Sequence, residues 1–240
     1  HANITTGLDE NKFGINSWDL PACADTLKRS GNLEFIGIHF HIGSQITEME
    51  VFRHLCVKVN EFSNWFSERG FLVRILNVGG GLGIDYRSPD GQIPDFEQYF
   101  KIFSDFLDVK AGQEVHFELG RALVGQCASL ISRVLYVKNG RKKNFVILDA
   151  GMTELMRPAL YHAYHKIENL SSNSQNGGFI KYDVVGPICE STDCFGKEIE
   201  LALTERGDLF AIRSTGAYGE VMASHYNLRE NVRVVYNEEA

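Results

Sequence analysis

Hydrophobic positions in the first half of the chain alternate between two periods. Runs rich in β-branched and aromatic residues predict three strands, at Leu33–Phe40, Val73–Val78 and Val115–Leu119. Between these runs, apolar residues recur every three or four positions and predict two amphipathic helices, one from Phe52 to a stop near Gly70 and one over Phe96–Leu107. The β-α-β-α-β order indicates a parallel sheet with crossover helices.

The pattern changes after Arg121. One short helical pattern lies near Pro158–Ile167, and the polar, glycine-ended stretch Asn169–Gly178 predicts a mobile loop. The other candidates are short strands separated by turn-like stretches, at Ser129–Val137, Phe145–Leu148, Lys181–Val185, Asp208–Ile212 and Val232–Tyr236. We therefore predict an α/β domain over residues 1–121 and a mostly antiparallel β-domain over residues 122–240.

The first half supplies only three or four strand units, whereas a closed (β/α)8 barrel needs eight. We expect either an open sheet or the latter part of a barrel whose first strands lie upstream of His1. The chain begins with His1 rather than Met, which is compatible with the second alternative.

Composition and charge exclude several classes of function. The 240 residues are 44% hydrophobic and 23% charged, which is ordinary for a globular protein that buries a core. The net charge of -7 argues against general binding to nucleic acid or to an anionic membrane, because both need a basic surface. No apolar run approaches the length of a membrane span, and residues 1–14 carry no signal-peptide pattern.

The cysteine count predicts the compartment. An odd number of cysteines without a dense pattern indicates free thiols in a reducing, cytoplasmic compartment. No Cys/His spacing indicates a zinc site, so we expect no metal. The five residues are Cys23, Cys56, Cys127, Cys189 and Cys194.

Three short motifs each follow a predicted strand: FHIGS (Phe40–Ser44), VGGGLG (Val78–Gly83) and FELGR (Phe117–Arg121). Each places glycine, a small hydroxyl or a charge where a strand ends, which indicates one small anionic ligand held by several loops. The glycine triplet allows backbone N–H groups to turn toward an anion. Its spacing does not fit the dinucleotide fingerprint G-x-G-x-x-G, and a tight turn without a ligand is the alternative.

Two pairs of residues near these motifs have both a chemical and a structural interpretation. His39 and His41 are two residues apart on a predicted strand and share a face. They are candidate metal ligands, which would suit a metal-dependent hydrolase, or they are packing histidines. Glu118 near Arg121 forms a structural ion pair, or else the carboxylate holds a proton on a ring nitrogen.

The motifs belong to a larger match. The chain resembles the fold-type III pyridoxal-phosphate (PLP) decarboxylases, and within them the branch that acts on meso-diaminopimelate. The resemblance implies that residues 1–121 are the latter part of a PLP-binding (β/α)8 TIM-like barrel and that residues 122–240 are a C-terminal β-barrel or sandwich domain. The matching segments span nearly the whole chain in the family's order: TGLDENKFGI (Thr6–Ile15), HFHIGSQI (His39–Ile46), NVGGGLGIDY (Asn77–Tyr86), ELGR (Glu118–Arg121), LDAGM (Leu148–Met152), RPALYHAYH (Arg157–His165), VVGPICESTD (Val184–Asp193) and GAYG (Gly216–Gly219).

The resemblance implies a set of cofactor-binding residues. His41 matches the histidine that stacks on the PLP ring. Glu118 matches the carboxylate that faces the pyridine nitrogen and keeps it protonated, which makes the ring a better electron sink. The others are Ser44, Gly79, Gly80, Gly81 and Gly120 in the phosphate cradle, with Arg121 and Tyr218 also at the cofactor.

The resemblance also implies catalytic and substrate-binding residues. Cys189 matches the proton donor to the α-carbon after CO2 leaves. Arg121, Arg157 and Tyr161 match the groups that bind the distal carboxylate of diaminopimelate, a task that suits forked guanidinium donors. Glu190 matches the partner of the distal ammonium.

Tyr218 in GAYG matches a tyrosine that contacts both cofactor and substrate.

Three of the residues assigned by the resemblance also have a structural interpretation that follows from residue type alone. Cys189 would be a buried structural cysteine, Arg157 a solvated surface charge and Tyr218 an ordinary strand aromatic.

The chain departs from the family pattern at two points. The motif Glu-Pro-Gly-Arg has Leu119 in place of proline, which leaves its charged residues intact. The Schiff-base lysine of the family lies on an early barrel strand in a Tyr-x-x-Lys-Ala-Asn-like context that does not occur here, and Lys12 is not that residue. We therefore expect this lysine to precede His1 and the 240 residues as given not to turn over substrate.

The function that the resemblance implies is the PLP-dependent decarboxylation of meso-2,6-diaminopimelate to L-lysine and CO2, the last step of lysine biosynthesis. In the family the Cys-Glu segment reaches the active site of the neighbouring subunit, so a cytoplasmic homodimer with shared active sites is expected. The alternatives are decarboxylation of another diamino acid, ornithine or carboxynorspermidine, and a catalytically silent homologue that regulates through its dimer surface.

Overall fold

The computed structural model describes residues 12–92, 94–171 and 178–236, and the chain divides into two compact units. The first unit includes the described residues up to Ile84 together with Gln92–Ala122. The second includes Asp85–Gly91 and the residues from Leu123 onward. The motif predicted over Thr6–Ile15 and the loop predicted over Asn169–Gly178 lie partly outside the described residues.

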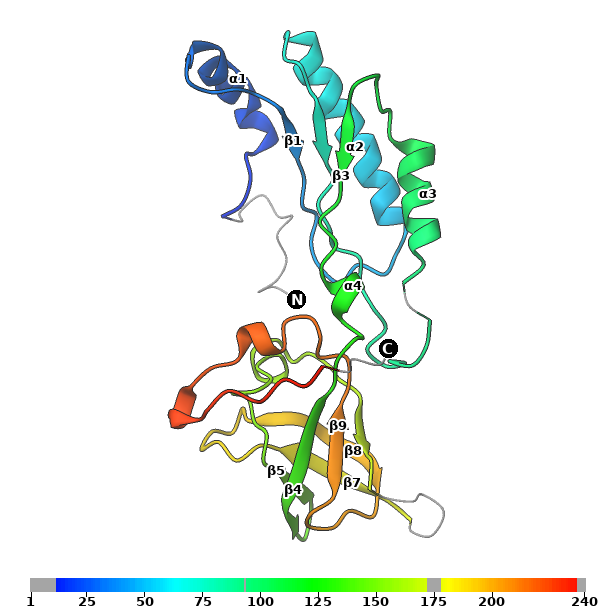
Figure 1. The fold of residues 1–240 in the computed structure, drawn as a ribbon, viewed down its shortest axis with the longest axis vertical. Coiled ribbons are helices and arrows are strands. Elements are labelled where there is room, and N and C mark those ends of the chain that lie inside the picture. The colour runs from blue at the N-terminus through cyan, green and yellow to red at the C-terminus, as the bar shows by residue number, and fades with distance from the viewer. Residues whose placement is uncertain (1–11, 93, 172–177, 237–240) are drawn as a thin grey trace. The chain divides into compact units, whose positions relative to one another are not determined.

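The first unit is a three-stranded parallel sheet with helices between the strands (Figure 1). The strand order β1-β2-β3 follows the chain, which confirms the predicted β-α-β-α-β series. Each strand is only three residues long. The pairing of β1 with β2 begins at Gly37 opposite Ile75 and ends at His39 opposite Asn77. The elements are η1 (Ser17–Asp19), α1 (Leu20–Arg29), β1 (Gly37–His39), α2 (Glu50–Glu68), β2 (Ile75–Asn77), α3 (Phe96–Phe106) and β3 (Glu114–His116), followed by α4 (Arg121–Val124).

Helix α2 ends where its sequence predicts. Gly70 has φ of +82°, a conformation that costs glycine little and other residues much. The N–H of Gly70 donates to Ser67 O and that of Phe71 to Phe66 O, which is the paired bonding of a Schellman motif. The rings of Phe66 and Phe71 then pack edge to face, 5.7 Å apart, and complete the stop with an apolar contact.

The core of the first unit lies between the sheet and helices α2 and α3. Phe52 of α2 is fully buried and packs edge to face on Tyr99 of α3 at 4.9 Å, with Phe103 one turn further along. Leu76 of β2 is buried in the same cluster. Asp95 caps α3 by accepting a hydrogen bond from the N–H of Gln98, 2.8 Å away.

The second unit is a six-stranded sheet in the order β6-β9-β4-β5-β7-β8. All neighbouring pairs are antiparallel except β5 with β7, so the predicted mostly antiparallel domain is confirmed. Strands β6 and β8, at the two ends of the order, also contact each other, so the sheet curls into a nearly closed barrel. The elements are β4 (Leu130–Asn139), β5 (Asn144–Leu148), α5 (Arg157–Tyr161), β6 (Ile167–Asn169), β7 (Phe179–Val185), β8 (Cys194–Ala202), β9 (Leu209–Ile212), η2 (Glu220–Met222) and η3 (Tyr226–Leu228).

Strand β4 forms the corner of this barrel. Leu130, Ser132 and Val134 point inward and alternate with exposed residues, as the sequence pattern predicts. The strand pairs with β9 at its start and with β5 at its end, and the register shifts between Val134 and Tyr136. A shift of this kind is a β-bulge, which bends one strand so that it serves two parts of a curved sheet.

Two predicted elements of the second unit need correction, and strands β6 and β8 were not predicted. Strand β8 was not predicted, because Glu198 has φ of +53° and breaks the alternation of inward and outward residues. The helix predicted near Pro158–Ile167 ends after Tyr161, since His162 takes the left-handed conformation. Val232–Tyr236 forms no strand, because an alternating pattern needs a hydrogen-bonded neighbour, and among the described residues this segment has none.

None of the helices among the described residues has both the length and the apolar character that a membrane crossing requires.

Replacing Phe52 by alanine tests the packing of the first unit. Loss of a fully buried ring should lower the free energy of unfolding by about 3–5 kcal/mol, as measured by urea denaturation. Val57 lies on the exposed side of the same helix, so Val57→Ala should change it by less than about 0.5 kcal/mol. Equal effects of the two substitutions would contradict the assigned buried face of α2.

Candidate active site

The loops that follow the three parallel strands meet at the glycine triplet. A Cβ on Gly79 would collide with the backbone oxygen of Phe40, which follows β1. A Cβ on Gly80 would collide with the backbone oxygen of Glu118, which follows β3. The glycine loop therefore runs between the other two loops at a separation that excludes any side chain, and it brings all three predicted motifs together.

Further backbone contacts fix this arrangement. The N–H of Ile46 donates to Gly81 O, and the N–H of Gly83 donates to Ile46 O, each over 2.9 Å. Arg121 is buried, and its Nη2 donates to the Ser44 hydroxyl over 2.9 Å. A hydroxyl from the first loop and a guanidinium from the third thus lie side by side near the glycines.

Glu118 is held by two neighbouring side chains. Its carboxylate accepts a hydrogen bond from Asn77 Nδ2 at 2.9 Å and pairs with His39 Nε2 at 3.2 Å. The hydrogen bond from Asn77 lowers the pKa of the Glu118 carboxyl, and His39 and His41 lower it further, while burial acts in the opposite direction. Glu118 therefore forms an ion pair with His39, which was not predicted from the sequence.

Asn77 connects the glycine loop to Glu118. It ends β2, and its Oδ1 accepts the N–H of Gly79 at 2.9 Å while its Nδ2 binds Glu118. No role was predicted for Asn77, although the NVGGGLGIDY match begins at this residue. Its partner Glu118 lies 41 positions along the chain, so only the fold reveals the contact.

The predicted histidine pair is arranged differently from a metal site. His39 is the last residue of β1 and faces Glu118, while His41 lies just beyond the strand and is exposed. Within the part of the chain that the structure describes, no group of three His, Cys, Asp or Glu side chains is placed to hold a metal ion.

In the second unit, Arg157 belongs to a buried aromatic cluster. It is the first residue of α5, and its Nη1 lies 2.8 Å from His165 Nε2. Its guanidinium lies over the ring of Tyr86, 4.8 Å from the centroid. Tyr161 ends the same helix and is half-buried. The alternative that Arg157 is a solvated surface charge is therefore wrong.

Cys189 and Glu190 lie in the loop between β7 and β8. The Asp193 carboxylate holds this loop by accepting the backbone N–H of Ile188 at 2.7 Å and that of Met152 at 2.6 Å. Burial raises the pKa of the Asp193 carboxyl, while these two hydrogen bonds lower it. The loop is thus tied to the LDAGM segment, and the Cys189 thiol is exposed, unlike a buried structural cysteine.

Glu190 is exposed and has two hydroxyl partners. Its carboxylate accepts hydrogen bonds from the Tyr226 hydroxyl at 2.5 Å and from Thr192 Oγ1 at 3.2 Å. The hydrogen bond to Glu190 raises the pKa of the Tyr226 phenol. Neither partner was predicted from the sequence.

Tyr218 lies in a turn that only glycines on either side allow. It has φ of +60° and is exposed. A Cβ on Gly216 would collide with Val124 O, and one on Gly219 with Thr215 O. The GAYG motif therefore holds the Tyr218 ring on the surface of the second unit, and the alternative of an ordinary strand aromatic is wrong.

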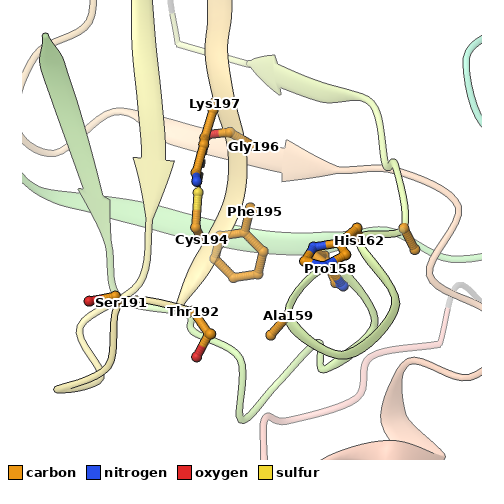
Figure 2. Close-up of a pocket in the computed structure, with 10 residues that line it drawn as sticks. Pro158, Ala159, His162, Ser191, Thr192, Cys194, Phe195, Gly196 and Lys197 are labelled. Atoms are coloured by element: carbon orange, nitrogen blue, oxygen red, sulfur yellow. Dashed lines mark hydrogen bonds between the residues drawn. The ribbon is translucent and has the colours of Figure 1, made fainter.

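A separate open cavity of about 360 Å³ lies in the second unit between α5 and the start of β8 (Figure 2). Pro158, Ala159 and His162 line one side, and Cys194 and Lys197 line the other. The residues of the second unit that were predicted to bind substrate or cofactor, or to donate a proton, do not line this cavity.

A sequence model described as pyridoxal-dependent decarboxylase, C-terminal sheet domain, matches residues 19–216. The chain belongs to this decarboxylase family. The predicted family and fold class are thereby confirmed.

Curated relatives in the family carry a common name. The diaminopimelate decarboxylase of Bacteroides thetaiotaomicron is 59% identical over 231 residues, covering 96% of this chain and 59% of the relative. That of Neisseria meningitidis serogroup B is 40% identical over 235 residues, covering 98% of this chain and 55% of the relative. The chain thus spans little more than half the length of these relatives.

Solved structures agree with this assignment. The crystal structure of diaminopimelate decarboxylase from Helicobacter pylori complexed with L-lysine matches 95% of this chain and 55% of that chain, with a TM-score of 0.85 and 38% identity. A lysine/ornithine decarboxylase from Vibrio vulnificus complexed with cadaverine matches 93% and 60% with a TM-score of 0.81, but its 23% identity indicates a shared fold alone.

The residues of the first unit fit the PLP that the family implies. A phosphate dianion suits a loop whose glycines leave no room for a Cβ, next to the Ser44 hydroxyl and the Arg121 guanidinium. Among the described residues, the N–H groups of Gly80 and Gly81 make no hydrogen bond to a protein acceptor. Glu118 has a lowered pKa, as an ionised partner of a pyridinium must.

Replacing Asn77 by alanine tests what holds Glu118. Loss of the Asn77 hydrogen bond should raise the pKa of the Glu118 carboxyl, which can be followed by its carbon chemical shift against pH. Asn64→Ala removes an exposed amide on α2 that accepts a hydrogen bond from Lys110 Nζ, and it should leave that pKa unchanged. An unchanged pKa in Asn77→Ala would show that other groups dominate the ionisation of Glu118.

Proposed function

We propose that the complete protein uses PLP to decarboxylate meso-2,6-diaminopimelate to L-lysine and CO2, the last step of lysine biosynthesis. The observation that carries the proposal is the buried Arg157 guanidinium, fixed between His165 and Tyr86. A fixed fork of N–H donors suits a carboxylate. Diaminopimelate has a distal carboxylate, and ornithine has none. The names of the relatives support the same substrate.

The first unit is proposed to hold the cofactor. Gly79, Gly80, Gly81 and Gly120, with Ser44 and Arg121, bind the phosphate, and His41 stacks on the ring. Glu118 keeps the pyridine nitrogen protonated. When bound, PLP supplies an electron sink for the negative charge that develops as CO2 leaves.

The second unit is proposed to handle the substrate. Arg157 and Tyr161, with Arg121, bind the distal carboxylate, and Glu190 binds the distal ammonium in place of its hydroxyl partners. Cys189 donates the proton to the α-carbon, a role that an exposed thiol on a fixed loop can fill. Tyr218 contacts both the cofactor and the substrate.

The assembly is part of the same proposal. We infer a homodimer in which the exposed Cys189–Glu190 loop completes the active site of the neighbouring subunit. The three parallel strands would belong to a (β/α)8 barrel, and the free thiols of the described cysteines suit a reducing cytoplasm.

The test uses the full-length protein with PLP and measures CO2 release from meso-diaminopimelate, ornithine and carboxynorspermidine in parallel. We expect release from diaminopimelate alone. Release from ornithine instead would keep a PLP decarboxylase but reject the distal-carboxylate role of Arg157. No release from any of the three would favour a catalytically silent homologue.

Arg157→Ala should lower kcat/KM for diaminopimelate by about 100-fold or more, because the carboxylate would lose a buried charged partner. Arg206 is an exposed arginine of the same unit, and Arg206→Ala should leave kcat/KM unchanged. If both substitutions have equally small effects, the substrate carboxylate is bound elsewhere.

Cys189→Ala should lower kcat by about 10²–10⁴-fold with little change in KM, since it removes a proton donor and not a binding contact. Cys23→Ala, in α1 of the first unit, is the matched control and should retain kcat. A kcat close to that of the unsubstituted enzyme in Cys189→Ala would assign proton donation to another group.

A further inference from the structure

We infer that His165 is a positioning residue for the substrate carboxylate: as a neutral imidazole, it fixes the plane of the Arg157 guanidinium. The inference rests on the proposed function, in which Arg157 binds the distal carboxylate. His165 lies between α5 and β6 and is 1% exposed. It ends the RPALYHAYH segment, in which roles were predicted for Arg157 and Tyr161 but not for His165.

Two hydrogen bonds define the protonation state of His165. Its Nδ1 lies 2.8 Å from the backbone oxygen of Arg213, and its Nε2 lies 2.8 Å from Arg157 Nη1. A carbonyl oxygen only accepts, so Nδ1 carries a proton. A guanidinium only donates, so Nε2 has none. Both bonds are satisfied only by the neutral imidazole with its proton on Nδ1.

A neutral acceptor suits an arginine that must bind an anion. A carboxylate in the place of His165 would orient the guanidinium but would also neutralise it. An uncharged nitrogen orients it and preserves its attraction for a substrate carboxylate. The guanidinium has five N–H donors, and the bond from Nη1 to His165 Nε2 uses one of them.

Tyr86 restrains both partners from the side. Its ring meets the His165 ring edge to face at 5.1 Å, and its face lies beneath the Arg157 guanidinium. The Arg213 guanidinium pairs with Asp90 and Glu168, and Lys166 also pairs with Glu168. Arginine side chains lose rotamer entropy when they are ordered. This cluster orders Arg157 on folding, so substrate binding need not do so.

Two substitutions separate positioning from packing. In His165→Gln, the side-chain oxygen reaches about as far as Nε2 and keeps an acceptor for Arg157. In His165→Asn, the amide N–H reaches about as far as Nδ1 and keeps the bond to Arg213 O, but no acceptor reaches Arg157. A purely structural role would be preserved better by asparagine, and a positioning role by glutamine.

The experiment measures L-lysine and cadaverine binding to the full-length PLP-loaded protein by calorimetry. L-lysine keeps the carboxylate expected at Arg157, and cadaverine lacks it. We expect the preference for L-lysine to fall by about tenfold or more in His165→Asn. It should largely persist in His165→Gln, with cadaverine affinity unchanged in both variants.

Each outcome decides a separate question. Equal weakening of L-lysine and cadaverine, or a larger loss in His165→Gln than in His165→Asn, would overturn the role of His165 and leave the proposed function standing. If the unsubstituted protein shows no preference for L-lysine, both the proposed role of Arg157 and this inference fail. If His165→Asn does not fold, His165→Gln decides alone: a retained preference supports the inference and a lost one overturns it.

Discussion

The close contact of the glycine loop with the loops on either side is the constraint on which the first unit depends. Gly79 lies against the backbone of Phe40 and Gly80 against that of Glu118, at separations that exclude a side chain. This contact holds the ends of three parallel strands together, so that Ser44, Arg121 and the Glu118 carboxylate reach one edge of the sheet. Close packing of the loops therefore requires glycine in this segment. Anion binding by backbone N–H groups requires glycine there as well, because a side chain would block the anion.

In the second unit, charged groups outside the strands are buried and held in place by hydrogen bonds. Arg157 is buried against Tyr86 and His165, and Asp193 is buried within the loop that carries Cys189. Burying a polar group is unfavourable unless it is hydrogen-bonded, and both groups are. A bonded and buried side chain has little freedom left, so the proposed contacts to substrate come from parts of the chain that are already ordered.

Features of the fold that depend on neighbouring residues were predicted from the sequence. Hydrogen bonds and strand pairing between distant residues were not. The stop of α2 at Gly70 follows from local apolar spacing and a glycine. The strand around Glu198 was missed because a left-handed residue breaks its alternation, and Val232–Tyr236 was wrongly predicted because a strand needs a partner. The resemblance located the segments that contain Asn77 and His165. Their roles depend on hydrogen bonds across 41 and 48 residues, which no local pattern encodes.

The central claim is that the cofactor-binding residues proposed in the first unit and the substrate-binding residues proposed in the second unit serve one PLP-dependent decarboxylase. A crystal structure of the full-length protein with PLP and L-lysine tests it most directly. The account predicts the PLP phosphate at Gly79–Gly81 and Ser44, the ring nitrogen at Glu118, and the lysine carboxylate within hydrogen-bond distance of Arg157. A phosphate bound away from the glycine loop, or a lysine carboxylate that makes no contact with Arg157, would contradict the account.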